Sequence, residues 1–130
     1  MASHVRLEGS LPASVASAFD ALAWEMELAG ARCTLLDNAI GELVSTLPPE
    51  HQARAIGEMH AVDLLSQQLS ALSSFARKVG GQVSEDVAVD VHFALSDITL
   101  SAVADRMLAA LGGKPQEVFE ADGAGELDLF

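Results

Sequence analysis

The sequence has 130 residues, of which 50% are apolar, and a formal net charge of −12. This length suits one domain with a sizeable core. The acidic balance argues against a nucleic-acid interface and against an anionic membrane surface as partner, because both interactions need a basic patch.

The first strong pattern is an unbroken apolar repeat that predicts a helix over residues 12–47. Its steps alternate between four and three residues, which is typical of a helix that packs along a bundle seam. Pro12 suits the first turn of this helix, where a missing amide hydrogen costs nothing. The repeat consists of Val15, Phe19, Leu22, Met26, Ala29, Cys33, Leu36, Ile40, Leu43 and Leu47.

A second helix is predicted over residues 49–79. Pro48 ends the first helix and Pro49 can open the second, whereas Gly80 and Gly81 stop it. The connection is so short that the two helices should form an antiparallel hairpin. The second apolar stripe consists of Val62, Leu65, Leu69, Leu72, Ala76 and Val79.

A third helix is predicted over residues 85–111. Its first part is β-branched and alternates between apolar and polar residues, so a strand over 87–93 is an alternative. The continuous helix is preferred because the sequence shows no partner strand, and an isolated strand cannot satisfy its edges. The predicted fold class is therefore all-α, with a helical domain over residues 1–111.

Residues 112–130 differ in composition from the rest of the chain. They are rich in Gly and acidic residues, so we expect a flexible tail. The tail ends in an apolar cluster with an acid inside it, formed by Leu127, Asp128, Leu129 and Phe130. This cluster either docks back onto the helices of its own chain or serves as a short motif for the groove of a partner.

Two long helices and one shorter helix leave apolar surface uncovered. Pairing two hairpins would close it, so we expect a homodimer with a four-helix bundle core. The beginning of the chain has no apolar stretch typical of a signal peptide, and no run of 18 apolar residues occurs. We therefore expect a cytoplasmic protein.

The histidines and the single cysteine, Cys33, offer little chemistry. No histidine shares a helix face with other suitable ligands, so we expect no metal site. His60 lies on a predicted exposed helix face, as a phosphoacceptor histidine would. Its neighbours do not fit the known phosphotransfer patterns, and phosphotransfer stays the minor alternative.

Asp63 and Gln67 are four residues apart, so they lie on one face of the second helix. A carboxamide can donate to and accept from water at once. Held against a phosphoryl group, it can therefore orient an attacking water, while a carboxylate one turn away can bind a lysine of a partner.

The run Asp63-Leu64-Leu65-Ser66-Gln67 resembles the Asp-Leu-x-x-Gln signature of the CheZ-type chemotaxis phosphatases. Members of that family are long helical hairpins that dimerise, and a terminal acidic-apolar peptide tethers the response regulator CheY. The hairpin and the Glu126–Phe130 ending extend the resemblance to most of the chain. The sequence is shorter than the enterobacterial members, and it is more similar to the small, divergent members called CheT.

The resemblance implies a hydrolase that dephosphorylates a CheY-like receiver domain. Gln67 would orient the hydrolytic water, and Asp63 would bind a conserved lysine of the receiver. Mg²⁺ would be held by the receiver, with no cofactor on this chain, and Leu127, Asp128, Leu129 and Phe130 would hold the receiver nearby. The third predicted helix has no clear counterpart in that family. The competing hypothesis is a non-catalytic helical adaptor whose Asp63 face is only solvated.

Overall fold

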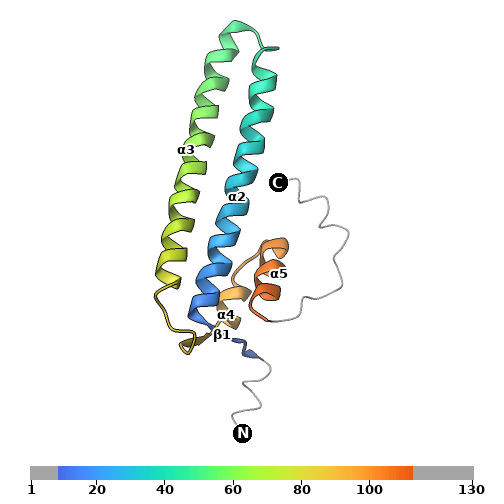
Figure 1. Ribbon diagram of the computed structural model, residues 1–130. Helices are drawn as coiled ribbons and strands as arrows, with labels where there is room; N and C mark the ends of the chain where they lie inside the picture. Colours follow the sequence, from blue (N-terminus) through green and yellow to red (C-terminus); the bar gives the residue numbers. More distant parts are fainter. Residues whose placement is uncertain (1–8, 113–130) are drawn as a thin grey trace. The chain divides into compact units, whose positions relative to one another are not determined.

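The computed structural model describes residues 9–112, which are mostly helical (Figure 1). Two long helices, α2 and α3, pack antiparallel, so the predicted all-α class and helical hairpin are confirmed. Within residues 9–112, no helix has the length and apolar character that a membrane crossing requires. The described elements are β1 (Pro12–Ser14), α2 (Val15–Val44), α3 (Pro49–Gly80), β2 (Ala88–Asp90), α4 (His92–Ser96) and α5 (Ser101–Ala110).

The chain divides into two compact units, and both long helices contribute to each of them. The hairpin unit is Ala23–Phe75. The strand unit contains, among the described residues, 9–22 and 76–112. The strands and the short helices thus belong to the strand unit, whereas the turn between α2 and α3 belongs to the hairpin unit.

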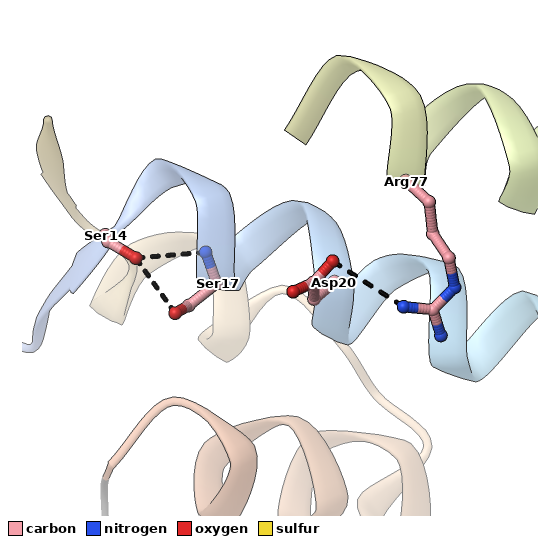
Figure 2. A network of polar contacts seen from close by, with 4 residues as sticks. All are labelled: Ser14, Ser17, Asp20 and Arg77. Carbon is pink, nitrogen blue, oxygen red and sulfur yellow. Dashed lines mark hydrogen bonds and ion pairs between the residues drawn. The ribbon is translucent and has the colours of Figure 1, made fainter. Parts of the chain in front are cut away.

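Helix α2 begins at Val15, so the prediction that Pro12 opens it is wrong. Ser14 caps the helix instead: its Oγ accepts a hydrogen bond from the Ser17 amide at 3.0 Å (Figure 2). The Ser14 hydroxyl also donates to Ser17 Oγ at 2.8 Å. Because the cap sets the first helical residue at Val15, the preceding residues are not helical and can pair in a strand.

Strands β1 and β2 pair antiparallel, with Pro12 opposite Asp90 and Ser14 opposite Ala88. The prediction of one continuous helix over 85–111 is therefore wrong, and the alternating stretch does contain a strand. Its partner is β1, far away in sequence and too short to give a strand pattern. Asp90 secures the pairing, because its Oδ1 accepts from the Leu11 amide at 2.9 Å and from the His92 amide at 3.0 Å.

The rest of the predicted third helix is divided into α4 and α5. The residue before α5, Leu100, has extended backbone angles, which separates the two helices. Both helices cover a small core of the strand unit, formed by Ala21, Val91 and Leu111. Leu95 of α4 and Met107 of α5 pack against this core. Two short helices that contact the same core therefore stand where one long helix was predicted.

Near the end of α3, two contacts hold it to the beginning of α2. Arg77 Nη1 lies 3.6 Å from Asp20 Oδ1 (Figure 2), but both side chains are well exposed, so this ion pair is worth at most about 1 kcal/mol. The closer contact involves Gly80, which is buried against Phe19. A Cβ atom at Gly80 would lie 2.8 Å from the Phe19 Cβ. This position therefore requires glycine for the approach of the two helices.

We expect Gly80→Ala to lower the free energy of unfolding by about 1–3 kcal/mol, because the added methyl forces the helices apart. Gly57 in the same helix is the matched control, since a Cβ there has no neighbour within 4 Å. Gly57→Ala should raise stability by up to about 1 kcal/mol through helix propensity alone. Urea denaturation followed by circular dichroism measures both, and equal effects of the two variants would contradict the packing role of Gly80.

Candidate functional site

The hairpin unit is held together by a narrow seam between α2 and α3. Small residues allow close approach there: Gly30 lies opposite Leu69, with 3.9 Å between a Cβ at Gly30 and the Leu69 Cβ. In this unit only Ala23 and Ser73 are buried. The half-buried seam positions are Met26, Gly30, Cys33, Asp37, Ile40 and Val44 of α2, and Ala55, Met59, Val62, Ser66 and Leu69 of α3.

Some members of each predicted apolar stripe point away from this seam. Leu36 and Leu43 each precede a seam residue of α2, and Leu65 and Leu72 stand in the same relation to the seam of α3. In an antiparallel pair, positions with the same offset lie on the same side of the hairpin. These four leucines, which we call the apolar face, are 47%, 60%, 46% and 53% exposed in that order.

Asp63 and Gln67 lie on the opposite side of the seam. Each follows a seam residue of α3 by one position, whereas the leucines of the apolar face precede one, so the side chains turn about 100° in opposite directions. Both side chains are exposed, and Gln67 Nε2 donates a hydrogen bond to Asp63 Oδ2 at 2.9 Å. The structure therefore brings the two predicted site residues together on an open, polar face.

This hydrogen bond fixes which end of the amide faces Asp63. An amide that donates through Nε2 can still accept through Oε1, so the pair presents a free acceptor next to a carboxylate. Both groups stand on the middle of a long helix, which limits their movement more than a loop would. Among residues 9–112, no group of three His, Cys, Asp or Glu residues is arranged to hold a metal ion.

The other predicted site residues are placed differently. His60 is exposed on α3, one turn before Asp63, and no hydrogen bond joins the two within the described hairpin. Leu127, Asp128, Leu129 and Phe130 lie outside the described residues. Cys33 is a free, half-buried thiol in the seam.

Two features of the structure were not predicted from the sequence. Asp37 lies in the seam with its Oδ1 buried and without a hydrogen-bond partner among the described atoms. A pocket of about 320 Å³ lies in the strand unit between α4 and α5, with His92 and Asp105 in its lining. The sequence contains a sign of the first feature, because the predicted apolar repeat passes over Asp37. The pocket depends on the division of the predicted third helix, of which the alternating stretch over 87–93 was the only sign in the sequence.

A comparison with models of protein families gives a match. The family described as "Domain of unknown function (DUF8776)" matches residues 14–130, which include α2, α3, β2, α4, α5 and the tail. No curated protein matches the chain, and no solved structure does.

Proposed function

We propose a function for this chain, which belongs to the DUF8776 family: it accelerates the hydrolysis of the aspartyl phosphate on a CheY-like receiver domain. The observation that carries the proposal is the exposed pair of Gln67 and Asp63, joined by a 2.9 Å hydrogen bond on α3. The resemblance of residues 63–67 to the CheZ-type signature gives this geometry a chemical meaning. A receiver of this kind is a cytoplasmic protein, so the proposal includes a cytoplasmic location.

In the proposed reaction, Gln67 enters the active site of the receiver and its Oε1 accepts a hydrogen bond from a water molecule. The water oxygen forms a bond to phosphorus while the bond between phosphorus and the receiver's carboxylate oxygen breaks. The products are inorganic phosphate, which takes up the proton, and a free carboxylate. Gln67 acts by orientation alone, so it needs a rigid position rather than a shifted pKa.

Asp63 has two roles in this proposal. It accepts the hydrogen bond from Gln67 and so fixes the amide, and its exposed carboxylate can bind the conserved lysine of the receiver. Mg²⁺ belongs to the receiver, whose own acids would hold it.

The direct test uses a phosphorylated receiver with Mg²⁺. We expect the wild-type chain to speed phosphate release and Gln67→Ala to abolish at least about 99% of that acceleration, as loss of a water-orienting group would. Gln68→Ala is the matched control: Gln68 is the next residue, equally a glutamine and exposed, but turned about 100° away. The unfolding free energy of Gln67→Ala should stay within about 0.5 kcal/mol of wild type.

Three results would contradict the enzyme proposal. Unchanged decay of several receivers with and without the wild-type chain supports the non-catalytic adaptor instead. Equal losses in Gln67→Ala and Gln68→Ala would place the chemistry elsewhere. Transfer of the phosphoryl group to this chain, lost in His60→Gln, would support phosphotransfer through His60.

The proposal gives the tail a tethering role. The family match runs through Phe130, so residues 126–130 belong to the matched domain. Deleting them should raise the receiver concentration needed for half-maximal rate by about 10-fold or more, because the local concentration of receiver falls. The rate at saturation should stay within about 2-fold of wild type, and its complete loss would contradict tethering.

We also propose a homodimer through the apolar face. Burying half-exposed leucines is worth roughly 1 kcal/mol each, and a dimer covers the leucines of both copies at once. Such a dimer leaves Asp63 and Gln67 open, because they lie on the other side of the seam. Four hairpin helices would then surround one core, as in other bundles.

Light scattering at micromolar concentration tests the dimer. Wild type should have the mass of two chains, and the double variant Leu36→Glu with Leu65→Glu that of one. Leu35→Glu with Leu64→Glu is the matched control, since each of these exposed leucines is one residue earlier and turned away from the apolar face. A monomeric wild type, or dissociation of the control pair instead, would contradict this interface.

A further inference from the structure

The strand unit contains a pocket that the proposed phosphatase reaction does not use. It has a volume of about 320 Å³ and lies between α4 and α5. This is near the lower end of the volumes that ligand pockets have. Its walls are mainly apolar, with one imidazole and one carboxylate: they include Leu11, His92, Leu95, Ala104, Asp105 and Leu108.

Exposed apolar side chains lie on α4 and immediately before α5. Phe93 of α4 is 74% exposed, and Leu100, immediately before α5, is 64% exposed. The Phe93 ring is held edge-on against the His92 ring, with 5.4 Å between the centroids. An apolar pocket next to exposed apolar side chains is typical of a surface that binds a short peptide.

We propose that this pocket binds residues 127–130 of the same chain. The pocket is lined by the middle of α5, and the tail follows α5 directly after Leu111 and Gly112. Asp105 lies five residues before the end of α5, or roughly 8 Å along the helix axis. Residues 113–126 can span at most about 50 Å when fully extended, so the connection is several times longer than the return requires.

The chemistry of the two partners is complementary. Leu127, Leu129 and Phe130 supply three apolar side chains for walls made mainly of leucine and alanine. Asp128 supplies a carboxylate, which His92 can bind. Asp105 would repel Asp128, so the acid of the tail must lie on the His92 side of the pocket.

A contact within one chain is occupied even when it is weak. A short connection gives an effective concentration on the order of 1 mM. If the separate peptide binds with a dissociation constant of about 0.1 mM, the tail fills the pocket about 90% of the time.

The contact does not depend on the phosphatase proposal. If both hold, the tail leaves the pocket when it tethers a receiver, and the pocket competes with the receiver for it.

The test compares the full chain with a variant that lacks residues 126–130, by amide NMR spectra of both. We expect deletion to shift the amides of Leu95, Ala104 and Leu108. A synthetic peptide of residues 126–130 should reverse these shifts in the deleted variant and bind it about 10-fold more tightly than it binds the full chain. The double substitution Leu129→Ser with Phe130→Ser should reproduce the deletion without altering any wall of the pocket.

A substitution in the wall of the pocket is a second test of the proposal. Ala104→Glu places a charge in the wall and should abolish peptide binding, whereas Ala53→Glu, at an exposed position of α3, should leave it unchanged. If Ala104→Glu does not fold, the tail variants still decide. The proposal is overturned if the peptide of residues 126–130 does not bind the deleted variant at a peptide concentration of about 1 mM. Equal binding to both chains, or shifts on the apolar face of the hairpin unit instead, would also overturn it.

Discussion

A hairpin of two helices has one seam, and one seam cannot cover two wide apolar stripes. This constraint shapes the whole described structure. In the hairpin unit the seam is made of small and half-buried residues, such as Gly30 opposite Leu69. The remaining leucines, including Leu36 and Leu65, stay about half exposed. The described hairpin unit therefore leaves part of its apolar surface exposed.

The same geometry separates two kinds of surface. The four leucines of the apolar face each precede a seam position, whereas Asp63 and Gln67 each follow one. One side of the hairpin thus carries the exposed leucines of the apolar face, and the other carries the exposed side chains of Asp63 and Gln67. The 2.9 Å hydrogen bond between Gln67 and Asp63 adds local order at a position that a dimer would leave open. An amide that acts only by orienting water benefits from such order, because misplacement by about 1 Å can cost about 100-fold in rate.

The sequence predicted the hairpin well because its signals are local. The two prolines at 48 and 49 and the four-three repeat determine the helices, and α3 was expected within one residue of its observed end at Gly80. The strand pairing was not predicted, and the reason is physical. Ala88–Asp90 pairs with Pro12–Ser14, which is a non-local contact between segments of only three residues. The placement of Asp63 beside Gln67 follows from helical spacing, whereas which side of the seam stays open depends on tertiary packing. The pocket beside α5 arises from the same non-local pairing and could not be predicted.

The central claim is that Gln67 itself enters the active site of a phosphorylated receiver. The most direct measurement is an NMR titration that follows the side-chain amide groups of Gln67 and Gln68. The added receiver carries beryllofluoride and Mg²⁺ in place of its aspartyl phosphate. The account predicts that the Gln67 side-chain resonances move on binding while those of Gln68 stay in place. Binding of the receiver with the Gln67 resonances unmoved would contradict it.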